Sequence, residues 1–323
     1  MGGPYAPRVA LLGGRPTVHV DVPICAVFLV LFLAFGISHM VIFRRNLSRG
    51  HKFIPSAVTF GFCMSRVIAN IMRIVWACYP DNVRVSIAAQ IFVAAGILLL
   101  FILNLLYAQR MLRAAFPVIG WSPAVSYSFK ALYILVVLTI IMVITCVIQT
   151  SYTLNPNTLR IDRDIQLYGV TYFAIVAFLP IPITALVLFF SRGRQIEHLG
   201  TGSWAAKGAI VLSAGILLCL GASFRAATNW MPPRPATYPP LYDHKACFYV
   251  FNFGLDLSVV ALFLVTRVDQ RFWVPNGSSA VRHYHGTSDE YKSSPLDGSV
   301  NNQDVEGNGH ALSNFPTPVK LEE

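Results

Sequence analysis

The chain has 323 residues, of which 55% are hydrophobic and 12% are charged. Soluble domains carry about 25% charged residues, so this composition excludes an ordinary soluble domain and indicates a protein with several membrane spans. The net charge of +10 is scattered in short segments between apolar runs, which argues against a nucleic-acid partner.

The apolar runs are long enough to cross a bilayer. A spanning helix needs about 20 mostly apolar residues. The first run that qualifies, residues 22–43, ends in a basic cluster, which indicates a true span rather than a signal peptide. Seven such runs predict an all-α, polytopic membrane protein with a seven-transmembrane helix bundle. The runs are residues 22–43, 53–78, 85–108, 129–150, 167–190, 208–229 and 246–266.

Lys and Arg residues are unevenly divided between the two sets of loops. The loops that follow the odd-numbered runs contain nearly twice as many as the others, and such residues concentrate on the cytoplasmic side. We therefore expect an outside N-terminus and a cytoplasmic C-terminus. The expected organisation is a short extracellular segment, residues 1–21, a bundle over residues 22–271, and a disordered cytoplasmic tail, residues 272–323, rich in Ser, Asn, Gly and Asp.

The second run contains polar residues that a lipid-facing helix would not carry. At about 100° per residue, Arg66, Asn70 and Arg73 lie on one stripe of the helix. A charge at the bilayer centre costs about 2.5–3.5 kcal/mol on insertion scales. We therefore expect this stripe to face the interior of the bundle.

The seventh run supplies the acid that lies deepest in any run, Asp256. Tyr249, Asn252 and Asp256 form a second polar stripe, and Asp256 lies at the same depth as Arg66. Because a buried charge needs a partner, we predict an intramembrane ion pair between Arg66 and Asp256, within a polar network that includes Asn252 and Tyr249.

Two other arginines, Arg73 and Arg225, lie in the outer half of the predicted bundle without an acid at matching depth. The positive charge would suit a small or lipid-like ligand, including an anionic one. We take Arg73, Arg225, Asn70 and Asn229 as candidate ligand-binding residues. In the alternative interpretation, the ion pair only clamps the helices, and Arg73 and Arg225 extend to lipid headgroups.

The prolines of the fifth run and the six cysteines allow two further predictions. Pro180 and Pro182 predict a kink in the fifth run. The six cysteines show no spacing typical of a metal site. A bridge between Cys78 and Cys247 remains an option, since both are expected at outer ends of helices.

Motifs of several membrane-protein chemistries are missing. His39 is the one histidine inside a run, the seventh run has no lysine for a retinal Schiff base, and neither GxxxxGK[ST] nor HExxH occurs. We therefore expect no enzyme activity, no catalytic residue, no metal and no cofactor.

Several segments together resemble a fungal seven-transmembrane family of unknown function whose members are often labelled family C-like G-protein-coupled receptors. The resemblance implies an integral membrane protein of receptor type, although YAQR (107–110) lacks the acid of the Asp-Arg-Tyr motif of rhodopsin-like receptors. The segments are FGFCMSRVIANIMRIVWACYP (60–80), AAQIFVAAGILLLFILNLLYAQRMLRAAFPVIGW (88–121), DIQLYGVTYF (164–173), GTGSW (200–204), GASFR (221–225) and RVDQRFWVP (267–275).

These observations favour a receptor or sensor that binds its ligand from the outer half of the bundle. Membrane lipids are expected partners, and the cytoplasmic loops and tail would meet a signalling partner. The span lengths favour the plasma membrane, with an endomembrane as the other option. A lipid or small-molecule translocator and a structural membrane protein without a ligand are the alternative functions.

Overall fold

The computed structural model describes residues 3–5, 9–235, 237–238, 240–275, 278 and 284. These residues lie in one unit, Met1–His285. Within them the regular elements are helices, apart from an isolated bridge between Val9 and Pro235. The predicted all-α fold is therefore confirmed.

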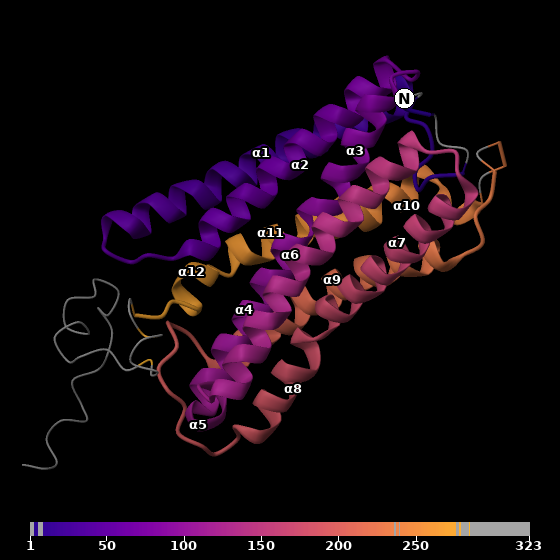
Figure 1. The fold of residues 1–323 in the computed structure, drawn as a ribbon. Coiled ribbons are helices and arrows are strands. Elements are labelled where there is room, and N and C mark those ends of the chain that lie inside the picture. Colours follow the sequence, from indigo (N-terminus) through magenta and orange to yellow (C-terminus); the bar gives the residue numbers. More distant parts are fainter. Residues whose placement is uncertain are drawn as a thin grey trace, which may run out of the picture. The chain divides into compact units, whose positions relative to one another are not determined.

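Figure 1 shows the helices and the connections between them. In chain order they are α1 (Val18–Ser48), α2 (Ile54–Cys78), α3 (Val83–Gly96), α4 (Leu98–Ala115), α5 (Pro117–Gly120), α6 (Pro123–Tyr152), α7 (Pro156–Phe178), α8 (Pro180–Phe190), α9 (Trp204–Trp230), the 3-10 turn η1 (Leu241–Asp243), α10 (Lys245–Tyr249), the π-helix η2 (Val250–Gly254), α11 (Leu255–Val265) and α12 (Val268–Arg271).

Seven helical stretches in the described part are long and apolar enough to cross a membrane, as the sequence predicts. The protein is therefore an integral membrane protein with a seven-helix bundle. The stretches are Val18–Ser48, Ile54–Cys78, Val83–Ala115, Pro123–Tyr152, Pro156–Phe190, Trp204–Trp230 and Lys245–Val265.

Several helices extend beyond the apolar runs that predicted them. The fifth stretch begins at Pro156, eleven residues before the predicted start. Its first turn is favoured by Asn155, whose side chain caps the helix, and by proline at the first helical position. The first stretch begins at Val18 rather than at residue 22, so that Asp21 lies inside the helix.

Three of the seven stretches are interrupted. The third breaks at Ile97, between α3 and α4. The fifth breaks at Leu179, directly before Pro180, whose ring removes a backbone donor, and this is the place where the sequence predicts a kink. The seventh contains the π-helix η2 between α10 and α11.

We call the end of the bundle that carries Val18 the N-terminal end, and the other the C-terminal end. Figure 1 shows α1 and α2 side by side along their length, with α10 at the N-terminal end and α5 and α8 at the opposite one. The third stretch has the largest buried share of the seven and lies in the core. The close approach of α1 to α2 requires Gly36, where a Cβ would lie 3.1 Å from that of Cys63.

The ordered bundle continues past residue 271, where the tail was expected to begin. Phe272 is fully buried, and its ring centroid lies 4.7 Å from that of Tyr107. The main part of the predicted tail, residues 285–323, lies outside the described residues. Cys78 and Cys247 are both free thiols, so the optional bridge between them is not formed.

Candidate functional site

A group of charged and amide side chains lies in the middle of the bundle, and we call it the mid-bundle cluster: Arg66, Asn70, Arg225, Asn252 and Asp256. Arg66 Nη2 lies 2.6 Å from Asp256 Oδ2, and both side chains are buried. The structure thus brings together the two residues that the sequence paired, from α2 and from the seventh span.

The interruption of the third span provides a further hydrogen-bond acceptor for Arg66. The Ile97 amide donates to the Ala95 carbonyl instead of to Val93, four residues back. Arg66 Nη1 donates to that Val93 carbonyl at 2.8 Å. The guanidinium also lies near the ring of Phe62, 5.3 Å from its centroid, which adds a cation–π attraction. The break in α3 therefore supplies an acceptor to a buried cation.

Arg225 of α9 joins this cluster from the other side. Its Nη1 donates to Asn252 Oδ1 at 3.1 Å, while its buried Nη2 has no hydrogen-bond partner among the described residues. Asp256 attracts this guanidinium and Arg66 repels it. Two cations thus share one carboxylate, which leaves the cluster with one uncompensated positive charge.

The second group, which we call the N-terminal-end cluster, is built around Asp21. Arg73 Nη2 lies 2.8 Å from Asp21 Oδ1, and Lys245 Nζ lies 2.5 Å from Asp21 Oδ2. The Tyr249 hydroxyl donates to Oδ1 at 2.7 Å, and the Thr17 amide donates to Oδ2 at 2.7 Å. The carboxylate therefore ties α1 to α2 and to α10.

This arrangement corrects the expectation that Arg73 has no acid. The first span was expected to start at residue 22, which placed Asp21 in a solvated flank. Because α1 starts at Val18, Asp21 lies in its first turn, where a negative charge is favoured by the helix dipole. The side chain is fully buried against Arg73.

The segment before α1 also contributes to this cluster, which sequence patterns did not indicate. The Gly13 carbonyl accepts from Arg73 Nη2 at 3.0 Å, and the guanidinium lies 4.0 Å from the centroid of the Phe248 ring. Gly13 has a φ of 79°, and a Cβ there would lie 2.6 Å from Phe248 Cγ. Only glycine fits this position.

The π-helix distributes the polar residues of the seventh span among different partners. Tyr249 precedes η2 and reaches Asp21, Asn252 lies within it and reaches Arg225, and Asp256 follows it and reaches Arg66. A π-turn inserts one extra residue into the helix and is frequent at functional sites. Hydrophobic periodicity does not reveal such an insertion.

The four predicted ligand-binding residues do not form one group. Arg73 belongs to the N-terminal-end cluster and Arg225 to the mid-bundle cluster. Asn70 Nδ2 donates to the Arg66 carbonyl at 2.8 Å, beside the ion pair. Asn229 is exposed and donates to the Arg225 carbonyl. Their role in ligand binding stays a prediction.

One hollow adjoins the N-terminal-end cluster, in the surface between α1 and the seventh span. We call it the first–seventh groove, and its volume is about 610 Å³. Lys245 and His244 lie at its N-terminal end, and the remainder is mostly apolar. It is lined by Val20, Ile24, Phe28, His244, Lys245, Ala246, Tyr249, Val250, Gly254, Leu255 and Ser258.

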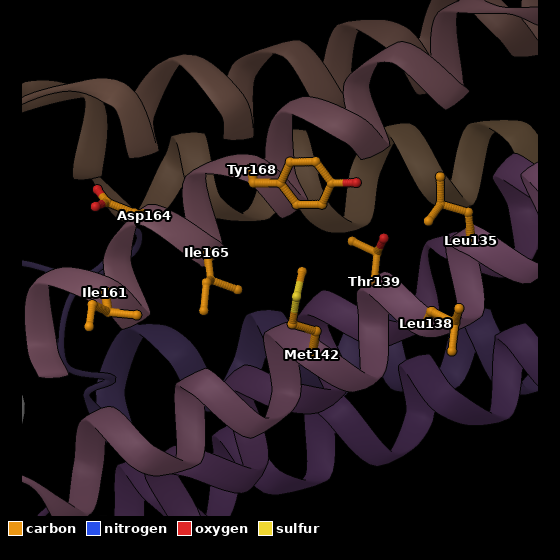
Figure 2. Close-up of a pocket in the computed structure, with 8 residues that line it drawn as sticks. All are labelled: Leu135, Leu138, Thr139, Met142, Ile161, Asp164, Ile165 and Tyr168. Carbon is orange, nitrogen blue, oxygen red and sulfur yellow. The ribbon is translucent and has the colours of Figure 1, made fainter.

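A second hollow of about 570 Å³ lies between α6 and α7. Figure 2 shows apolar side chains from both helices facing it, with Asp164 at one end and the Tyr168 ring across it. Thr139 is buried at its floor, whereas Tyr168 is 49% exposed. Neither hollow is lined by Arg73, Arg225, Asn70 or Asn229.

Comparison with known proteins adds one match. Residues 203–273 match the model of a family described as "Protein of unknown function (DUF3112)". The matched segment runs from the start of α9 to Trp273 and therefore contains Arg225, Asn252 and Asp256. No curated protein and no solved structure matches the chain.

Proposed function

We propose that the protein is a receptor or sensor of the plasma membrane, with its N-terminal end outside and no enzyme activity. Its ligand is an anionic, lipid-like molecule that enters the first–seventh groove from the bilayer. The observation that carries this proposal is Lys245, which lines the groove and is also held by the buried carboxylate of Asp21.

Charge favours an anionic headgroup at Lys245. The N-terminal-end cluster contains two cations, Arg73 and Lys245, and one carboxylate, so one positive charge is uncompensated. The side chain of Lys245 is 24% exposed, whereas that of Asp21 is fully buried. A ligand anion can therefore approach the lysine, where Coulomb attraction is stronger than in bulk water.

The remainder of the groove favours an acyl chain. Phe28, Val250 and Leu255 present apolar surface to it, and its volume lies within the range of about 300–1,000 Å³ typical of small-molecule sites. Gly254 lines the groove without a side chain. A Cβ added there would meet only the Tyr249 carbonyl oxygen, at 3.7 Å, so the space beside this glycine is open. A larger side chain at this position would extend into the groove.

The same contacts offer a route from ligand to conformation. Asp21 ties α1, α2 and α10 together through Arg73, Lys245 and Tyr249. An anion that draws Lys245 away from Asp21 weakens one of these ties, and a ligand shifts a conformational equilibrium by its difference in affinity for the two states. The cytoplasmic loops and tail would then present a changed surface to a signalling partner.

Binding of oleate and of oleyl alcohol, which share a chain length and differ in charge, tests the proposal. With purified protein in phosphatidylcholine nanodiscs, we expect oleate to bind at least about tenfold more tightly, the value of one charge-assisted hydrogen bond. Lys245→Gln should abolish this preference. Gly254→Leu should weaken both ligands.

Gly61→Leu is the matched control for the groove variant, because Gly61 is an exposed glycine of α2 and a Cβ added there would meet no atom within 4 Å. It should bind both ligands as the unaltered protein does. Unchanged oleate binding by both Lys245→Gln and Gly254→Leu would reject the groove as the site. Absence of oleate binding by the unaltered protein would favour the structural alternative.

A lipid translocator is the second candidate, favoured by the opening of the first–seventh groove at the surface of the bundle between α1 and the seventh span. In vesicles, transfer of a fluorescent phospholipid between leaflets that depends on the protein and is lost in Gly254→Leu would support it. Oleate binding without any transfer would support the sensor.

A further inference from the structure

Two cations converge at the C-terminal end of the bundle, on the turn that precedes α9. Lys207 Nζ donates to the Gly202 carbonyl at 3.0 Å. Arg271 approaches the same glycine, because a Cβ at Gly202 would lie only 2.5 Å from its Nη1 atom. Gly202 has a φ of 86° and no side chain, so its backbone admits both groups.

No acid compensates these two charges among the described residues. Lys207 is only 4% exposed, and the charged group near it is another cation, Arg271. Neither residue takes part in the ion pairs formed by the described side chains. An ammonium has three N–H donors, and the described residues supply a single acceptor, the Gly202 carbonyl, to that of Lys207. A buried cation without an anion is costly.

The surrounding groups are also suited to an anion. Thr201, Gly202 and Ser203 are exposed, and Ser203 caps the start of α9. The 27-residue helix directs its positive dipole end to this turn. Arg271 is held from behind, since its Nε donates to the Thr266 carbonyl at 2.7 Å. Its two Nη groups donate to no other side chain or carbonyl in the described part of the chain, so they are available to a ligand.

We propose that Lys207 and Arg271 bind a phosphate group. It comes either from the headgroup of an anionic phospholipid in the leaflet at this end or from free phosphate. Arg and Lys are the side chains that bind phosphate through charge-assisted hydrogen bonds. Basic pockets between spanning helices on the cytoplasmic side bind such headgroups. The site lies at the opposite end of the bundle from Lys245 and does not depend on the proposed sensor function.

The test measures thermal unfolding of the full chain in two arms. In phosphatidylcholine nanodiscs, inorganic phosphate is titrated against chloride at equal ionic strength. In the second arm, a fraction of the phosphatidylcholine is replaced by phosphatidylinositol 4-phosphate. We expect stabilisation in at least one arm. Stabilisation by the lipid alone assigns the site to a headgroup, and stabilisation by inorganic phosphate alone assigns it to free phosphate.

Variants separate this site from general surface charge. Arg271→Gln should weaken the phosphate effect about tenfold or more, the value of a hydrogen bond between charged groups. Arg192→Gln is the matched control. It removes an equal charge from an exposed position in the connection between α8 and α9, which also contains the Gly202 turn. It should behave as the unaltered protein does.

Lys207→Gln should abolish the effect, and if that variant does not fold, Arg271→Gln decides. The proposal is overturned if neither arm stabilises the unaltered protein. It is equally overturned if Arg192→Gln loses as much of the effect as Arg271→Gln, because the attraction would then be a diffuse property of the surface.

Discussion

The mid-bundle cluster and the N-terminal-end cluster contain the same ingredients in different settings. Each combines two cations with one carboxylate. In the mid-bundle cluster, Arg66 and Asp256 are 0% and 1% exposed, and Arg225 keeps a buried donor that has no partner among the described residues. In the N-terminal-end cluster, Asp21 is as deeply buried, but Lys245 reaches the surface of the groove.

Under the proposed function, net charge alone does not decide whether a buried cluster responds to a ligand. Both clusters have an excess charge of +1. The positive charge of Lys245 can be compensated at the groove, because water, a lipid headgroup or a ligand can contact the lysine there. Arg225 donates a hydrogen bond to Asn252 and is attracted by Asp256, whose charge it shares with Arg66. Under the same proposal, the mid-bundle cluster is a clamp and the N-terminal-end cluster is the region that responds to a ligand.

The largest effect is expected from Asp256→Asn, which tests the clamp. The substitution keeps the shape of the side chain and leaves Arg66 and Arg225 facing each other without an acid. Loss of one partner of a buried ion pair costs about 3–5 kcal/mol. Denaturant-induced unfolding in detergent micelles should show a loss of at least this size.

Arg66→Met provides the control, because Asp256 then retains Arg225 as a cation. It should destabilise less than Asp256→Asn, and adding Arg66→Met to Asp256→Asn should recover part of the loss. Strictly additive losses in the double variant would show that Arg66 and Asp256 are not coupled, and the clamp would be refuted.

Asp21→Asn should have a smaller effect of about 1–3 kcal/mol, the cost of leaving buried donors without their acceptor. Lys245 can turn towards the groove, and Arg73 keeps the Gly13 carbonyl and the Phe248 ring. The same unfolding measurement applies. A loss equal to that of Asp256→Asn would mean that the groove gives Lys245 no relief, and the two regions would not differ.

The features that depend on composition and on depth in the membrane could be predicted from the sequence. Seven apolar runs are enough to find the spans, because lipid imposes length and apolarity on every one of them. The pairing of Arg66 with Asp256 followed from matching depths and from the cost of a lone charge in the bilayer. Pro180 and Pro182 predicted a kink because a proline removes a backbone donor wherever it lies, and the helix break lies directly before Pro180.

Other parts depend on contacts that no local pattern encodes. Asp21 lay outside the apolar run, and only the start of α1 at Val18 shows that it is buried. The π-turn of η2 leaves the hydrophobic pattern unchanged, yet it decides which helix Asn252 faces. Gly13 and Gly202 place carbonyls beside cations that are far away in the chain or across a turn, which only the three-dimensional structure reveals.

The smallest effect on stability is expected from Lys245→Gln, about 0–1 kcal/mol, as for an ion pair that is partly solvated. Asp21 would keep Arg73, Tyr249 and the Thr17 amide, so the fold loses one of several partners. Added salt screens charges at the surface more than buried ones, so the difference between variant and unaltered protein should shrink as salt rises. The loss of stability caused by Asp256→Asn should not change with salt. If the loss from Lys245→Gln were large and independent of salt, Lys245 would be a second buried clamp, and an anionic ligand could not draw it from Asp21.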